Sequence, residues 1–278
     1  MGHGQTNGGV VVTGASSGIG AAIVREMAER GFRVFGTVRR ARDAAGVEAA
    51  GGIPVTLDVA YVPGIERAKD AVERGLNGLP LRALVNNAGV PAVGALEHLD
   101  LDVLRKALEV NVVGAVAVTQ AFLPLLRAAK GRVVNISSVS ARMALPFAGP
   151  YAASKAALEA ISDSLRRELL PTGVDVIVIQ PGSVRTPIWE KIAEVDLRPF
   201  ADTIYEPALT RLRGQALKSG ELGLPPEAVA RAVLRAITQR RPPTRILVVG
   251  RGRWFQRVVR LLPDRFLDWL VGRRIWRR

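Results

Sequence analysis

Tyr151 and Lys155 are the side chains in this sequence best suited to acid–base chemistry. They are four residues apart, so a helix would place them one above the other on the same face. An isolated phenol has a pKa of about 10 and exchanges protons poorly near neutral pH, but a neighbouring ammonium favours the phenolate and lowers that pKa. The pair could therefore exchange a proton with an alcohol or a ketone, although the same spacing also occurs where a ring packs and a lysine is solvated.

The strands that would position this pair are short, rich in Val and Ile, and separated by helical patterns. Strands of this kind that alternate with helices predict parallel βαβ units with helices on both faces. The expected fold class is α/β, with a Rossmann-type doubly wound parallel sheet of about seven strands in a single domain. The expected strands are 10–12, 33–38, 53–57, 83–85, 132–136, 174–179 and 245–249.

Residues 9–250 are expected to form the catalytic domain. The Gly-rich leader, residues 1–8, has no apolar core and is expected to be disordered, not a signal peptide. Residues 183–226 contain five prolines and are expected to form one long irregular stretch that serves as a functional lid. Residues 251–278 are expected to form a basic amphipathic tail.

The amino-acid composition excludes several kinds of functional site. The chain has 278 residues, is 48% hydrophobic and contains no cysteine, so it has no disulfide, thiolate metal site or cysteine nucleophile. Two histidines cannot build a His-rich metal site, so no metal is expected. No run approaches 18 uncharged apolar residues, and we expect no membrane-spanning segment. The predicted location is the cytoplasm, with peripheral attachment to a membrane surface as an option.

The net charge of +14 is concentrated in the tail, where residues 251–278 hold nine Arg against two Asp. Trp254, Leu261 and Leu262 would share one face of a helix there. Basic residues beside such a face suit an anionic membrane interface. The same face could instead pack on the substrate lid or on another subunit, and the sequence leaves both alternatives open. Nucleic acid is not expected, because the Arg residues alternate with apolar ones.

Gly14, Gly18 and Gly20 follow the first expected strand and open the first expected helix. Glycines at this junction allow a tight turn and a close approach of the backbone to a pyrophosphate at the helix N-terminus. Their spacing is G-x-x-x-G-x-G, which differs from the usual G-x-G-x-x-G fingerprint. The turn predicts dinucleotide binding, although glycines here can also serve backbone geometry alone.

Arg39 and Arg40 follow the second expected strand, where an adenosine ribose would lie. A carboxylate at this position binds a free 2′-hydroxyl, whereas an Arg accommodates a 2′-phosphate. The sequence has no carboxylate there, which favours NADP(H) over NAD(H). The alternative is that the two Arg simply begin a solvated helix.

Taken in chain order, these motifs resemble the short-chain dehydrogenase/reductase family. The resemblance runs from Gly8 to about Gly250. The matching residues are Thr13-Gly14-x-x-x-Gly18-Ile19-Gly20, Asp58, Asn86-Asn87-Ala88-Gly89, Asn111, Ser138, Tyr151-x-x-x-Lys155 and Pro181-Gly182.

The resemblance implies that Tyr151 is the general acid–base and that Ser138 hydrogen-bonds the substrate oxygen. Lys155 would bind the nicotinamide ribose and lower the pKa of Tyr151, and Asn111 would hold a water that links Lys155 to solvent. Cofactor contacts are implied for Gly14, Ser16, Ser17, Gly18, Ile19, Gly20, Arg39, Arg40, Asp58, Val59, Asn87, Ala88, Gly89, Tyr151, Lys155, Pro181, Gly182, Val184 and Thr186.

Two features depart from the family pattern. Many NADP-dependent members carry a basic residue inside the glycine turn, where this chain has Ser16 and Ser17, so the cofactor preference depends on Arg39 and Arg40. Many members also have a glycine shortly after the catalytic serine, whereas residues 139–142 here are Val-Ser-Ala-Arg. We therefore expect that loop to follow a different course beside the substrate.

The resemblance implies an NADP(H)-dependent oxidoreductase that interconverts an alcohol with its ketone or aldehyde. Apolar residues in 183–226 predict a small lipophilic alcohol or carbonyl substrate. The Thr186-Pro187 start of this segment and the Arg-rich tail resemble members of the family that act on steroids, retinoids or related lipids. A homo-oligomer, dimer or tetramer, is expected from the family. One alternative is a 3-oxoacyl thioester reductase that uses the same chemistry, and another is a non-catalytic NADP-sensing protein.

Overall fold

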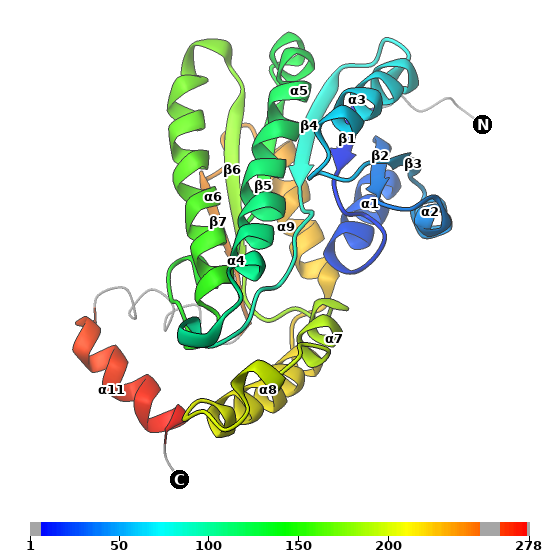
Figure 1. Ribbon diagram of the computed structural model, residues 1–278. Coiled ribbons are helices and arrows are strands. Elements are labelled where there is room, and N and C mark those ends of the chain that lie inside the picture. Colours follow the sequence, from blue (N-terminus) through cyan, green and yellow to red (C-terminus); the bar gives the residue numbers. More distant parts are fainter. Residues whose placement is uncertain (1–6, 251–261, 277–278) are drawn as a thin grey trace.

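Seven parallel strands form the centre of the computed structural model, which describes residues 7–250 and 262–276 (Figure 1). They lie in the order β3-β2-β1-β4-β5-β6-β7, so the chain enters at the middle of the sheet and extends it first to one edge, then to the other. This order confirms the predicted doubly wound sheet, and each predicted strand is present with small shifts of its ends. The strands are β1 Gly9–Val12, β2 Arg33–Val38, β3 Ile53–Thr56, β4 Leu81–Asn86, β5 Arg132–Ile136, β6 Asp175–Pro181 and β7 Arg245–Val248.

Helices cover both faces of the sheet because the strands are apolar on both sides. On one face, α1 and α9 pack together against residues such as Val10, Val134 and Ile179. On the other face, α3 and α5 enclose Val11, Leu84 and other buried residues. The α-helices are α1 Gly18–Glu29, α2 Ala44–Ala49, α3 Val62–Leu76, α4 Leu101–Leu108, α5 Gly114–Ala129, α6 Gly149–Glu168, α7 Ile188–Ala193, α8 Glu206–Glu221, α9 Pro226–Thr238 and α11 Asp264–Ile275.

The carboxyl ends of the strands meet at one edge of the sheet. The strand order reverses between β1 and β4, and in open α/β sheets ligands bind outside the strand ends at such a switch point. Helices α7, α8 and α11 gather below this edge in Figure 1. The sheet therefore presents its strand ends to a separate layer of helices.

The prediction of an irregular lid over residues 183–226 is wrong, because most of that segment is helical. Its prolines lie where helices begin: Pro187 is the N-cap of α7, and Pro207 lies in the first turn of α8. Proline is favoured there, since its missing N–H has no partner in the first turn and its fixed φ suits the helix.

The structure describes part of each end of the chain. Asn7 belongs to the leader that was predicted to be disordered, yet its side chain donates to the Arg30 carbonyl at 2.8 Å. The tail forms α11 after Pro263, and one side of that helix packs on the lid. The predicted apolar face around Trp254 lies outside the described residues.

Residues 101–129 run through α4, a π-helical turn and α5 without interruption, and this run is long and apolar enough to span a membrane. Length and hydropathy alone therefore make this run a candidate span, although the sequence contains no run of 18 uncharged apolar residues. The run packs as a core helix instead, because Val118, Phe122 and Leu126 are fully buried against the sheet.

Candidate active site

The turn between β1 and α1 has the geometry of a phosphate cradle. Gly14 and Gly18 both adopt positive φ, at 65° and 56°, a region that side-chain-bearing residues avoid. A Cβ at Gly20 would lie 2.3 Å from the Gly14 carbonyl oxygen, so only glycine fits. Ser17 precedes α1 without capping it, and the first-turn N–H groups of α1 therefore remain available to an anion.

The end of β4 holds this turn in place. The Thr13 hydroxyl accepts hydrogen bonds from the backbone N–H of Asn87 at 2.9 Å and of Ala88 at 3.0 Å. The Asn87 side chain donates in return to the carbonyls of Thr13 and Gly14. These bonds join two strand ends into one floor, which fits the predicted adenosine side of a dinucleotide site.

Arg39 and Arg40 differ in their partners. The Arg40 guanidinium forms an ion pair with Asp43 at 3.1 Å, whereas Arg39 has no ion-pair partner within the described residues. Arg39 is therefore the guanidinium that remains available to a 2′-phosphate. At Asp58 the carboxylate accepts from the Ala60 N–H at 3.0 Å, so this residue closes a turn and also faces the site.

Helix α6 brings Tyr151 and Lys155, the predicted catalytic pair, to the end of β5. The Lys155 ammonium lies 5.8 Å from the centre of the Tyr151 ring and donates to the Ile136 carbonyl at 2.9 Å. Ser138 follows β5, and its hydroxyl accepts from the Ser140 N–H at 3.1 Å. The three side chains predicted to act together are thus held at one place by β5 and α6.

Burial changes the proton affinities of this pair. Burial raises the pKa of Tyr151, and a hydrogen bond with Ser138 acts in the opposite direction. Burial also lowers the pKa of Lys155 to about 8. Desolvation of the phenolate therefore opposes the lowering that the resemblance implies for Lys155, and that role of Lys155 stays a prediction. Tyr151 is therefore a neutral phenol at pH 7, which suits a proton donor.

Asn111 lies in a π-helical turn, Glu109–Val113, between α4 and α5. Its side chain is buried, accepts from the Val90 N–H at 2.8 Å, and donates to the Val90 carbonyl and to Ser154. A Cβ at Gly89 would meet both the Asn111 carbonyl oxygen and the Lys155 ammonium. Asn111 is thus a neighbour of the catalytic lysine, and its role in proton relay remains a prediction.

A cavity of about 1340 Å³ joins these parts. Every predicted cofactor-contacting residue lines it, together with Ser138, while Asn111 lies outside its lining. The glycine turn and the start of the lid also touch, because a Cβ at Gly18 would lie 3.1 Å from the Thr186 side chain. These residues fit a dinucleotide that extends from Arg39 along the glycine turn to Tyr151.

The lid contributes one stripe of each of its two helices to the same cavity. On α7 the lining residues are Ile188, Trp189, Lys191, Ile192 and, just beyond the helix, Val195. On α8 they are Leu209, Leu212, Arg213 and Ala216, with the spacing of one helix face. Each stripe is apolar except for one cation.

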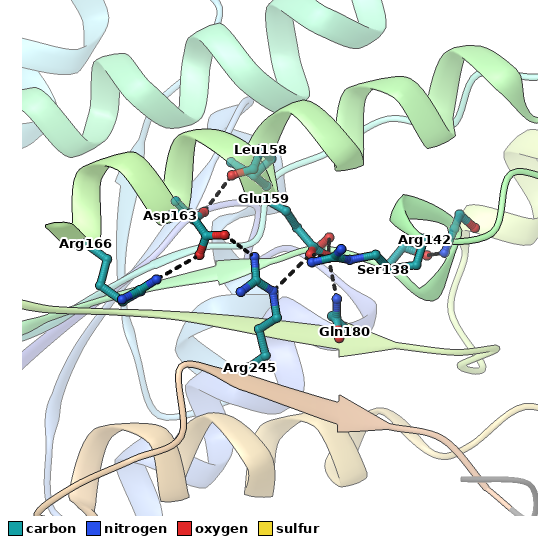
Figure 2. Close-up of polar contacts among 11 residues, drawn as sticks. Ser138, Arg142, Leu158, Glu159, Asp163, Arg166, Gln180 and Arg245 are labelled. Carbon is teal, nitrogen blue, oxygen red and sulfur yellow. Dashed lines mark hydrogen bonds and ion pairs between the residues drawn. The ribbon is translucent and has the colours of Figure 1, made fainter. Parts of the chain in front are cut away.

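Sequence reasoning missed a buried acidic residue beneath the site. Glu159 is 3% exposed and accepts hydrogen bonds from Ser137 and Gln180, and Figure 2 shows it between Arg142 and Arg245. Only its position on α6, four residues after Lys155, could have pointed to it. Its partners come from distant strands, which local spacing cannot reveal.

Comparison with known proteins agrees with this geometry. The model of a protein family described as "short chain dehydrogenase" matches residues 9–196 of this chain. The chain belongs to the short-chain dehydrogenase family. An NADPH-dependent 3-dehydrocapnine reductase from Ornithobacterium rhinotracheale is 39% identical to it, over 93% of this chain and 94% of that protein.

Other members of the family show how broad the likeness is. A mitochondrial D-beta-hydroxybutyrate dehydrogenase from Rattus norvegicus is 33% identical, over 85% of this chain and 75% of that protein. The structure of an F189W actinorhodin polyketide ketoreductase with NADPH superposes with a TM-score of 0.75 and 30% identity, over 91% of this chain and 98% of that one. This short-chain dehydrogenase is therefore an oxidoreductase that acts on hydroxyl or ketone groups.

Proposed function

We propose that this short-chain dehydrogenase is an NADP(H)-dependent enzyme that interconverts a lipophilic alcohol and its ketone or aldehyde. The observation that carries the proposal is that Ser138, Tyr151 and Lys155 line the same cavity as the glycine turn and Arg39. A carbonyl group and a dinucleotide bound in this cavity would meet at the proton donor.

The residues divide the work of reduction between them. Tyr151, neutral because burial raises its pKa, gives its proton to the carbonyl oxygen. Ser138 hydrogen-bonds that oxygen as negative charge develops on it. Lys155 supports the resulting phenolate as a cation and is positioned to bind the nicotinamide ribose. The nicotinamide, when bound, supplies the hydride.

The preference for NADP(H) follows from the residues after β2. Arg39 offers a guanidinium that forms no ion pair with any residue of 7–250 or 262–276, and Arg40 neutralises Asp43, the one carboxylate close to it in sequence. Guanidinium groups bind phosphate through charge-assisted hydrogen bonds. The NADPH-dependent relative and the ketoreductase solved with NADPH support this preference.

The lid supports a lipophilic substrate that also carries an anionic group. Its cavity-facing stripes are apolar, which suits a steroid, a retinoid or an acyl chain. Lys191 and Arg213 are the exceptions, and neither has an ion-pair partner within the described residues. None of the lid's carboxylates lines the cavity. The hydroxybutyrate dehydrogenase, by its name, acts on a hydroxy acid, which supports a 3-oxo acid with an apolar chain over a neutral lipid.

The test is a panel of substrates in a single assay of NADPH oxidation. The panel holds a medium-chain 3-oxo acid, its methyl ester, the corresponding methyl ketone, an acyl thioester and a retinoid aldehyde. We expect the highest kcat/KM with the free acid. A preference for the thioester would support the carrier-linked alternative, and NADPH binding without turnover of any member would support a sensor.

We also propose that this enzyme is cytoplasmic and contacts a membrane surface. The exposed side chains of α11 support the membrane contact. Phe266, Trp269 and Leu270 are exposed, at 46%, 52% and 39%. Phe266 stacks on Trp269, and the Arg273 guanidinium lies over the same indole at 4.7 Å. Aromatic and basic residues together suit the headgroup region of anionic lipids. The opposite side of α11 packs on the lid through Ile275, so packing and membrane contact use different sides.

A further inference from the structure

Four residues of α6 share one stripe: Tyr151, Lys155, Glu159 and Asp163. The first two belong to the proposed reaction. The third, Glu159, is a carboxylate with 3% exposure that the reaction does not use. A buried carboxylate is costly unless donors surround it, so its partners indicate why it is there.

The Glu159 carboxylate collects four donors from four segments (Figure 2). Its Oε1 atom accepts from the Ser137 hydroxyl at 2.8 Å and from the Gln180 amide at 2.7 Å. Its Oε2 atom accepts from the Nε atoms of Arg142 at 3.3 Å and Arg245 at 3.2 Å. Each carboxylate oxygen therefore accepts two hydrogen bonds, and the single negative charge of Glu159 lies beside two guanidinium groups.

The partners of Glu159 are neighbours of functional residues. Ser137 precedes Ser138, which caps the short 3₁₀ turn Val139–Ala141, and Arg142 directly follows that turn. Gln180 precedes Pro181 and Gly182, which line the cavity and are implied cofactor contacts. Through these bonds, one side chain on the helix of Tyr151 fixes the ends of β5 and β6.

We propose that Glu159, through Arg142, is a positioning residue that sets the Ser138 hydroxyl relative to the Tyr151 phenol. This inference rests on the proposed carbonyl reduction. The loop after Ser138 is fastened to α6 by Arg142, which donates to Glu159. A displacement of about 1 Å between reacting groups can lower a rate by about 10²-fold, so such a clamp affects turnover.

Arg142 and Arg245 provide a matched pair for testing this role. Both donate to the same oxygen of Glu159, but only Arg142 belongs to the Ser138 loop. Arg245 lies on β7 and also pairs with Asp163 at 2.8 Å, so its removal leaves the Ser138 loop attached. A purely structural role for the network would make the two Arg equivalent in catalysis.

The experiment measures kcat, the KM for NADPH and the Tm of Arg142→Met and Arg245→Met in the full chain. We expect Arg142→Met to lower kcat about tenfold, at unchanged KM for NADPH, and Arg142→Lys to recover most of that loss. Arg245→Met is expected to lower the Tm and keep kcat within about twofold. Equal loss of kcat in the two Met variants, or loss that follows Tm alone, would overturn the inference.

Glu159→Gln extends the test to the carboxylate itself. With the charge removed, the further substitution Arg142→Met should leave kcat unchanged, because the clamp is already lost. An undiminished effect of Arg142→Met in that background would contradict the inference, and if Glu159→Gln does not fold, the two Arg variants decide alone. Tyr151→Phe, run in the same assay, separates the two proposals: turnover that survives this change refutes the proposed reaction, not the clamp alone.

Discussion

The sheet edge and the lid are built on different principles. At the edge, polar side chains such as Thr13, Asn87 and Asn111 are fixed by directional hydrogen bonds to backbone atoms. In the lid, Phe200 and Leu209 pack with Phe147 and with Ile275 of α11, through contacts that have no preferred direction. We therefore expect the edge to determine which reaction occurs and the lid to determine which molecule undergoes it.

This difference leads to a general expectation. Proton transfer requires donor and acceptor within about 2.6–3.2 Å, so changes at the edge should affect all substrates alike. Apolar walls tolerate changes of shape, so changes in the lid should affect substrates selectively. The predictions below test that division.

The largest effect is expected for Lys155→Met, compared with Lys191→Met in the lid. Loss of the Lys155 ammonium removes the cation that supports the Tyr151 phenolate, and kcat should fall by about 10²-fold or more for every substrate. Lys191→Met should leave kcat unchanged with neutral ketones. Steady-state rates of both variants across the substrate panel test these expectations. A loss of kcat in Lys155→Met that depended on the substrate would contradict the division between the sheet edge and the lid.

The next effect concerns cofactor choice. Arg39→Ala should raise the Kd for NADPH about 10- to 100-fold, as expected for a charge-assisted hydrogen bond, and change the Kd for NADH little. Asp43→Ala should act in the opposite direction and tighten NADPH, because it frees Arg40 from its ion pair. Fluorescence titration gives both constants, and equal losses for NADPH and NADH in Arg39→Ala would refute the 2′-phosphate assignment.

The pH profile should show the titration of Lys155. With its pKa lowered to about 8, this lysine is a cation below pH 8 and neutral above it. The kcat/KM for reduction should therefore fall as pH rises through about 8, by about tenfold at pH 9. Tyr151 cannot cause this fall, since its pKa is raised above its ordinary value. A profile that stays flat to pH 10 would contradict the assignment.

A smaller and selective effect is expected for Arg213→Met. Its loss should raise the KM for the 3-oxo acid about tenfold and leave the KM for the methyl ester unchanged, because only the acid carries a charge. Arg211→Met is the matched control, since Arg211 is exposed on the same helix and does not line the cavity. If acid and ester lose affinity equally, Arg213 does not bind the anionic group.

The smallest effect is expected at the membrane. Replacing Phe266 and Trp269 with Ser should lower the fraction that sediments with anionic vesicles by a few-fold and leave kcat with soluble substrates unchanged. Leu170→Ser is the control, because Leu170 is an apolar residue that is 73% exposed and lies just after the C-terminal end of α6, outside α11. Unchanged sedimentation in the double variant would exclude α11 as the attachment site.

The same division explains what the sequence could predict. The strands were predictable, and every residue predicted to contact the cofactor lines one cavity, because these residues belong to short motifs at strand ends. The lid was not, since Pro187 and Pro207 look like helix breakers although they begin helices. The ion pair of Arg40 with Asp43 and the raised pKa of Tyr151 also escaped prediction, because they depend on local geometry and burial.

The strand order has a consequence for how the chain folds. β1 pairs with β2 on one side, but its other partner, β4, comes only after α1, α2, α3 and two more strands have been made. During synthesis, the strand that carries the glycine turn must therefore wait with one open edge. Pairing between strands that are distant in sequence is slow, because the chain loses the entropy of loop closure before the stabilising contacts between the strands form. The dependence of folding on chaperones should therefore increase with the time that passes before β4 emerges from the ribosome.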